Sequence, residues 1–190
     1  MPETKSPHPV TLPALFEASV ERFGDNVLIR EKKDGTWQDT TYRETRALVH
    51  RCAAGLRDLG LAGGDRVALI SEGRREWPVS ELGILYAGGV NVPISVKIEE
   101  LGELKFRLAH AGCRMVVASL AQARKVLQVR GELPSLELLI LLDDLEEQVA
   151  GSIAFATVLE RGVARLRTDP DVVEPGSSGY LATLCSMFAV

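Results

Sequence analysis

The feature that most restricts the fold of this chain is a repeated alternation of strand-like and helix-like segments in its middle. Apolar runs of strand length alternate with segments of helical spacing, in the order Arg66–Ser71, Trp77–Ala87, Val90–Ile94, Ile98–Ala111, Arg114–Ser119, Leu120–Arg130 and Leu136–Leu142. Such runs are typical of strands covered on both faces, and strands that alternate with helices are joined by right-handed crossovers. The middle of the chain therefore predicts an α/β fold with a largely parallel sheet flanked by helices.

A small helix is predicted ahead of this sheet. Thr11 can cap a helix from Leu12 to Phe23, and Gly24 can end it. Its apolar residues recur at helical spacing and are expected to share one buried face: Leu12, Leu15, Phe16, Val20 and Phe23.

A β-hairpin and a second helix follow. Segments 27–30 and 36–40 read as strands joined across Lys33-Asp34-Gly35, where Asp-Gly supplies the positive φ of a tight turn. Thr41-Tyr42-Arg43-Glu44 matches a capping box, and apolar residues then recur at helical spacing until Gly60. After residue 143 the alternation weakens, with a helix predicted over 155–166 and a loop over 168–179.

Composition and charge narrow the class of protein. Apolar residues make up 46% of the chain and charged residues 25%, values that are typical of a folded globular protein. The net charge of −4 gives no attraction for a phosphate backbone, so nucleic acid is not an expected partner. The three cysteines, Cys52, Cys113 and Cys185, have no zinc or disulfide spacing and fit a reducing compartment. No transmembrane segment is expected, because the longest uncharged stretch, residues 82–96, is too short to span a bilayer.

A search for catalytic, cofactor-binding and metal-binding residues yields none that can be assigned. The glycines at 60, 63 and 64 precede a strand, whereas a dinucleotide-binding motif follows one. Gly176-Ser177-Ser178-Gly179 lacks the lysine that ends a phosphate-binding loop. His50 and His110 have no ligand-type neighbours at a metal-binding spacing, and Cys52 and Cys113 are expected to be small core residues.

The segment from Ser71 to Trp77 is the most unusual one. It places charges and a tryptophan just beyond the carboxyl end of a parallel strand, where ligands gather in open α/β sheets. A charged helix start, with Trp77 packed on a neighbouring helix and Glu72 and Glu76 favoured by the helix dipole, explains the same residues equally well.

Taken together, several segments resemble the AMP-forming acyl-CoA synthetases, members of the adenylate-forming enzymes. The similar segments are Thr11–Phe16, Arg22–Asp25, Tyr42, Gly55-Leu56, Leu59–Leu61, Gly64–Leu69, Glu76-Trp77 and Leu85–Pro93. Glu76-Trp77, and Lys125 after a valine-rich strand, resemble the long-chain fatty-acid branch.

This resemblance implies an incomplete N-terminal portion of the adenylate-forming fold. Residues 1–10 would be a disordered tail, 11–184 a partial N-terminal domain, and 185–190 a divergent, truncated end. The complete enzyme would use ATP, Mg²⁺ and coenzyme A to activate a fatty acid through an acyl-adenylate.

The family's Ser/Thr/Gly-rich loop ending in Lys, its aromatic-Gly-x-Thr-Glu segment and its C-terminal Lys have no counterpart in this sequence. This chain alone is therefore expected to be inactive and to bind none of these cofactors. Two alternatives stay open: a non-catalytic α/β interaction module and an unrelated nucleotide-binding protein. The expected location is the cytoplasm. The complete enzyme could also associate peripherally with a membrane.

Overall fold

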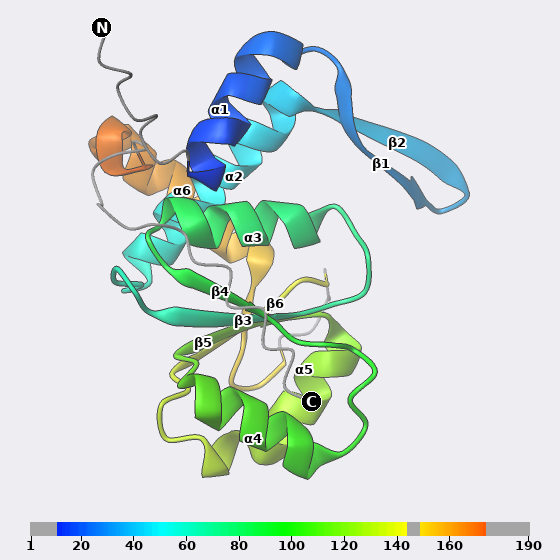
Figure 1. Ribbon diagram of the computed structural model, residues 1–190, viewed down its shortest axis with the longest axis vertical. Helices are drawn as coiled ribbons and strands as arrows, with labels where there is room; N and C mark the ends of the chain where they lie inside the picture. The colour runs from blue at the N-terminus through cyan, green and yellow to red at the C-terminus, as the bar shows by residue number, and fades with distance from the viewer. Residues whose placement is uncertain (1–10, 144–148, 174–190) are drawn as a thin grey trace, which may run out of the picture.

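A computed structural model describes residues 11–143 and 149–173 and contains a parallel sheet of five strands (Figure 1). The strands are β3 (Arg66–Ile70), β4 (Val90–Pro93), β5 (Met115–Ala118), β6 (Leu138–Leu141) and β7 (Ile153–Ala154). Their order is β4-β3-β5-β6-β7, and every neighbouring pair is parallel. The predicted α/β fold is confirmed, and the four strands predicted from the alternation lie in one sheet. The two-residue strand β7 was not predicted, because so short a segment carries no periodicity.

Helices cover both faces of the sheet (Figure 1). One face carries α2 (Tyr42–Asp58), α3 (Glu76–Tyr86) and α6 (Phe155–Thr168), and the other carries α4 (Leu101–Ala111) and α5 (Leu120–Val129). Side chains alternate along β3, so Val67 and Leu69 join the first apolar cluster whereas Ala68 and Ile70 join the second. Burial on both faces explains why the sequence of β3 is continuously apolar.

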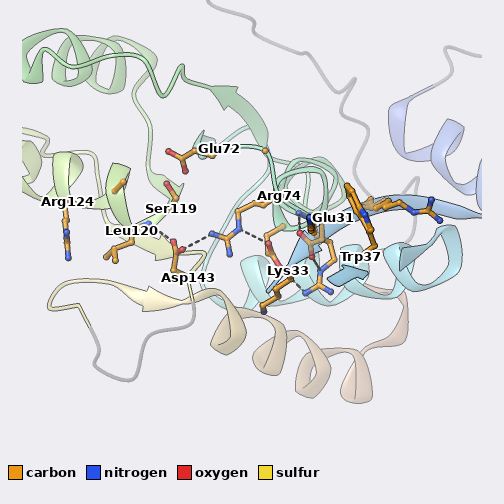
Figure 2. Close-up of a pocket in the computed structure, with 16 residues that line it drawn as sticks. Glu31, Lys33, Trp37, Glu72, Arg74, Ser119, Leu120, Arg124 and Asp143 are labelled. Atoms are coloured by element: carbon orange, nitrogen blue, oxygen red, sulfur yellow. Dashed lines mark hydrogen bonds and ion pairs between the residues drawn. The ribbon is translucent and has the colours of Figure 1, made fainter. Parts of the chain in front are cut away.

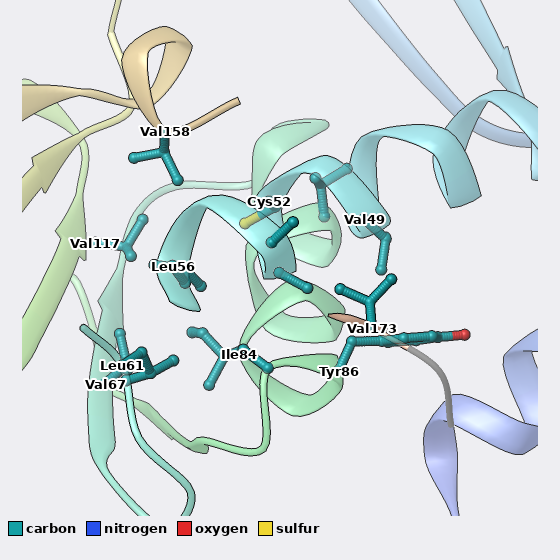
Figure 3. Packing of buried hydrophobic residues seen from close by; sticks show 14 of the residues in the cluster. Val49, Cys52, Leu56, Leu61, Val67, Ile84, Tyr86, Val117, Val158 and Val173 are labelled. Atoms are coloured by element: carbon teal, nitrogen blue, oxygen red, sulfur yellow. The ribbon is translucent and has the colours of Figure 1, made fainter. Parts of the chain in front are cut away.

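Helix α2 lies at the centre of the first cluster, where Val49, Cys52 and Leu56 are fully buried (Figure 3). It approaches α6 so closely that a β-carbon at Gly55 or Gly162 would overlap the backbone of the opposite helix. Glycine at both positions therefore permits the contact that fixes α6 against α2.

The N-terminal helix and hairpin form as predicted. In α1 (Leu12–Phe23) the Thr11 hydroxyl accepts a hydrogen bond from the Ala14 N–H at 3.2 Å. The hairpin strands β1 (Val27–Lys33) and β2 (Thr36–Thr41) are longer than predicted and turn at Asp34 and Gly35, whose φ values are 51° and 79°. The capping box at Thr41 is also present.

The predicted buried face of α1 is only partly correct. Phe16 and Val20 are buried, but Leu12, Leu15 and Phe23 are 36%, 50% and 38% exposed. Helix α1 covers its neighbours with one narrow stripe, so apolar residues beside that stripe remain in contact with water.

Several helix boundaries differ from the predictions, and α3 runs from Glu76 to Tyr86 rather than from Trp77 to Ala87. Helix α4 starts at Leu101 rather than Ile98, α5 passes into a short 3₁₀ helix at Arg130–Glu132, and α6 extends to Thr168 before a second 3₁₀ helix at Pro170–Val173. The predictions for residues 1–10, for Gly176–Gly179 and for 181–190 lie outside the described residues. No helix in ranges 11–143 and 149–173 is long and apolar enough to cross a membrane.

Candidate functional site

A cleft of about 860 Å³ lies where the carboxyl ends of the parallel strands face the hairpin (Figure 2). One wall comes from the loops that follow β3, β5 and β6, and the other comes from β1 and the start of β2. The chain reaches this edge repeatedly because each parallel strand points the same way. Its lining residues are Ile29, Arg30, Glu31, Lys32, Lys33, Trp37, Glu72, Gly73, Arg74, Arg75, Glu76, Ser119, Leu120, Ala121, Arg124 and Asp143.

Arg74 joins three of the loops at the centre of the cleft (Figure 2). Its guanidinium donates to Glu76 Oε2 at 2.8 Å, to Asp143 Oδ1 at 3.0 Å and to the Leu142 carbonyl at 3.1 Å. The other Asp143 oxygen accepts the Leu120 backbone N–H at 2.6 Å, which places this carboxylate at the start of α5. The network fixes the loops after β3, β5 and β6 relative to one another.

Glu76 stays ionised inside this network. Burial alone would raise the pKa of its carboxyl, but the hydrogen bond from Arg74 and the charges of Arg74 and Arg75 outweigh burial and lower that pKa. Arg75 donates to Glu76 Oε1 at 3.1 Å, so both carboxylate oxygens carry a guanidinium. Both oxygens of Glu76 therefore already accept hydrogen bonds from arginine, and the carboxylate is not arranged to act as a general base.

The hairpin is joined to the sheet edge through Glu31. Glu31 Oε2 accepts the Arg75 backbone N–H at 3.1 Å, and Glu31 Oε1 lies 3.9 Å from Arg75 Nε. Within the described residues, these two contacts between Glu31 and Arg75 are the only polar contacts between the sheet edge and the part of the hairpin beyond Leu28 and Thr40. The hairpin base is anchored more firmly, since Leu28 packs on the first apolar cluster and the Asn26 carbonyl accepts the Tyr42 N–H at 3.1 Å.

Glu72 occupies the far end of the sheet wall. Its Oε1 accepts the Gln122 amide at 3.0 Å, and the hydroxyl of Ser119 and the Gln122 amide together lower the pKa of the Glu72 carboxyl. Each of the four carboxylates that line the cleft thus accepts a hydrogen bond from another residue of the chain: Glu31, Glu72, Glu76 and Asp143.

Three cations of the cleft have no carboxylate or carbonyl partner among the described residues: Lys32, whose Nζ lies 6.0 Å from the Trp37 ring, Lys33 and Arg124. Six of the lining residues are cationic and four are anionic, although the whole chain carries a net charge of −4. Lys33 on the hairpin and Arg124 on α5 form no side-chain hydrogen bond or ion pair with any described residue, and both are exposed. They lie on opposite walls, so the cleft offers positive charge from both sides to an anion.

The Ser71–Trp77 segment combines features of both interpretations, and ligand binding there stays a prediction. Trp77 packs against the first apolar cluster, as expected for a helix start, whereas Glu72, Arg74 and Glu76 line the cleft. Sequence reasoning missed the hairpin's contribution to this site, because nothing local in residues 29–37 indicates which sheet edge they face. Trp37 was also missed, although it is 63% exposed and its ring lies 6.0 Å from Lys32 Nζ.

The other candidate residues have structural surroundings. Burial raises the pKa of both the Cys52 and the Cys113 thiol to about 12, so neither is a nucleophile at neutral pH. His50 lies 3.0 Å from Glu17 Oε1 and against the Tyr86 ring, and His110 stacks on Phe106. No group of three or more His, Cys, Asp or Glu residues among those described could hold a metal ion.

The fold is that of the adenylate-forming enzymes. The chain superimposes on a long-chain-fatty-acid CoA ligase of Rhodopseudomonas palustris with a TM-score of 0.70 and 24% identity, covering 80% of this chain and 37% of that one. It matches the anthranilate CoA ligase AuaEII with a TM-score of 0.72 and 19% identity over 80% of this chain and 29% of that one.

Sequence comparison identifies the family within this fold. The model of the AMP-binding enzyme family matches residues 16–185, and the chain belongs to that family. It is 30% identical to the long-chain-fatty-acid–CoA ligase ACSBG2 of Xenopus laevis over 142 residues, which are 74% of this chain and 19% of that protein. It is 31% identical to the ligase FadD15 of Mycobacterium bovis over 129 residues, 67% of this chain and 20% of that one. The resemblance to AMP-forming acyl-CoA synthetases is confirmed, and the chain spans about a fifth of these relatives.

Proposed function

We propose that this chain supplies the N-terminal sheet of an ATP-dependent long-chain acyl-CoA ligase and forms no acyl-adenylate by itself. The observation that carries the proposal is the match to the AMP-binding family over residues 16–185, combined with relatives of which the matched segment covers only 19% and 20%. The complete enzyme would activate a fatty acid with ATP and Mg²⁺ and pass the acyl group to coenzyme A. A carboxylate needs this activation because it is a poor electrophile until it carries a good leaving group.

The arrangement of the cleft supports the inactivity of the isolated chain. Adenylation needs donors and a cation placed where charge develops on the phosphate. Here the two central guanidinium groups, Arg74 and Arg75, are already bound to Glu76, and Arg74 also binds Asp143. The cleft therefore resembles a structural junction with spare cations at its walls rather than a complete catalytic centre.

The cleft also bears on whether this chain alone binds a phosphate-containing cofactor. Sequence reasoning expects this chain alone to bind neither ATP nor coenzyme A. Lys33 and Arg124 nevertheless give a polyphosphate two unpaired cations, which supports weak, salt-sensitive binding in the cleft. Magnesium has no described ligand set here, so it would enter only with a phosphate.

A chimera tests the proposed function. This chain would replace the matching fifth of the Mycobacterium bovis ligase FadD15, and palmitoyl-CoA formation would be compared with that of a version lacking the segment. We expect activity in the chimera and none in the deletion. A chimera that melts cooperatively yet makes no palmitoyl-CoA would contradict the proposal.

One observation favours the interaction-module alternative. Leu12, Leu15 and Phe23 expose apolar surface along α1, and such surface can mark a contact with another protein. A folded but inactive chimera, together with a stable monomeric chain, would make the module the better explanation.

A further inference from the structure

We infer that the β1–β2 hairpin is a lid that closes over the cleft when a polyphosphate anion bridges Lys33 and Arg124. The inference rests on the proposed weak binding of phosphate in this cleft and adds a conformational response to it. The ligand class is an extended phosphate anion, because Lys33 and Arg124 stand on different walls rather than at one point.

The hairpin is built to move as a unit about its base. Near the base, Leu28 packs on the first apolar cluster and Thr40 is buried. Beyond the base, β1 and β2 are largely exposed on both faces. The ribbon keeps its own shape there because Arg30 and Asp39, which are cross-strand partners, form a bidentate ion pair with distances of 2.5 and 2.7 Å.

The contact that holds the lid in its present position is weak. Glu31 accepts one hydrogen bond from the Arg75 backbone, and its ion pair with the Arg75 side chain is long at 3.9 Å. Partly exposed ion pairs of this kind contribute little to stability, so small forces can shift the hairpin.

An anion in the cleft would supply such a force. Lys33 is the residue before the hairpin turn, and Arg124 projects from α5 on the opposite wall (Figure 2). A polyphosphate held by Arg124 also attracts Lys33, and this attraction grows as the turn approaches α5. Binding energy is thereby converted into closure, as expected when a ligand prefers one of two conformations.

The test measures the distance between the hairpin turn and α5. Spin labels would be attached to the variants Thr36→Cys and Gln128→Cys, which are exposed positions beside Lys33 and Arg124 that do not themselves line the cleft. Cys185→Ser removes one native thiol, and the buried Cys52 and Cys113 should not label. Tripolyphosphate is the probe, with binding followed separately by ³¹P NMR.

If the hairpin closes as a lid, tripolyphosphate shifts the distribution of distances between the two spin labels to shorter values. Lys33→Gln should abolish this shift. Lys97→Gln, which removes an exposed lysine outside the cleft, is the matched control and should respond like the parent. Glu31→Gln should broaden the distribution without ligand and still close with it. Binding without any change in distance would overturn the lid but not the cleft as an anion site. Absence of binding would overturn both, while the chimera assay would still decide the ligase proposal.

Discussion

The Arg74 guanidinium lies 3.0 Å from the Asp143 carboxylate and joins the loop after β3 to the end of β6 (Figure 2). Asp143 also accepts the backbone N–H of Leu120 at 2.6 Å, so one carboxylate connects three segments far apart in the sequence. The shape of the cleft depends on this connection.

We predict that Asp143→Ala lowers the free energy of unfolding by about 1 to 3 kcal/mol, because it removes one of the three acceptors of the partly buried Arg74 guanidinium and the acceptor of the Leu120 N–H. Urea denaturation provides the measurement. Asp25→Ala is the matched control, because the Asp25 side chain is 90% exposed in its ion pair with Arg43, and it should change stability by less than about 0.5 kcal/mol. Equal effects of the two substitutions would contradict a structural role for Asp143.

Replacement of Gly162 by alanine should destabilise the fold strongly. A β-carbon there would overlap the Arg51 carbonyl, so α6 would have to move away from α2 at a cost of about 3 kcal/mol. Gly102 provides the control: it is also helical, but a β-carbon there meets nothing, so Gly102→Ala should be neutral or stabilising by up to about 1 kcal/mol. Thermal melts of both variants decide this, and a harmless Gly162→Ala would show that the two helices are not in close contact.

The pH dependence of stability should include a contribution from Glu81. Burial raises the pKa of this carboxyl, despite the hydrogen bond that it accepts from Asn91 at 3.1 Å. A folded-state pKa above the unfolded value means that Glu81 supports the fold below the unfolded value and loses this contribution as pH rises through the folded value.

Glu81→Gln should therefore stabilise the protein at pH 7, raising the melting temperature by about 1 to 3 °C, and have less effect near pH 4. Because Glu81 is only partly buried, solvent screening keeps the effect small. A melting temperature that falls at pH 7 would show that the Glu81 charge is needed.

The two buried thiols should be unreactive in the folded chain. With a pKa of about 12, Cys52 and Cys113 hold almost no thiolate at pH 8. In a Cys185→Ser variant, a disulfide reagent should modify neither thiol until urea unfolds the protein, and then both. Rapid modification without urea would mean that the first or the second apolar cluster opens readily.

Much of the fold was predictable because its signals are local and periodic. The continuous apolar run at β3 indicated a strand covered on both faces, and Thr41 with Glu44 marked the start of α2. The exposed face of α1 was not predictable, because helical spacing reveals an apolar stripe but not how much of it a neighbour covers. Leu15 shows this, with half of its surface exposed.

The site was less predictable than the fold. The Ser71–Trp77 segment was singled out by its place after a strand, and part of it lines the cleft. The partners of that segment are Glu31, Asp143 and Gln122, which lie between 44 and 69 residues away from those they contact. No local pattern encodes such pairings, so only the folded chain brings them together.

The most direct measurement of the central claim is pyrophosphate release by the purified chain with palmitate, ATP, magnesium and coenzyme A. We expect no release above a control without protein, because the family's Ser/Thr/Gly-rich loop ending in Lys and its C-terminal Lys, which have no counterpart in this sequence, would each supply several kcal/mol of transition-state stabilisation. The intact relative FadD15 of Mycobacterium bovis would serve as the reference assayed in parallel. Palmitate-dependent pyrophosphate release by this chain would contradict the account, since its own residues would then have to perform the adenylation.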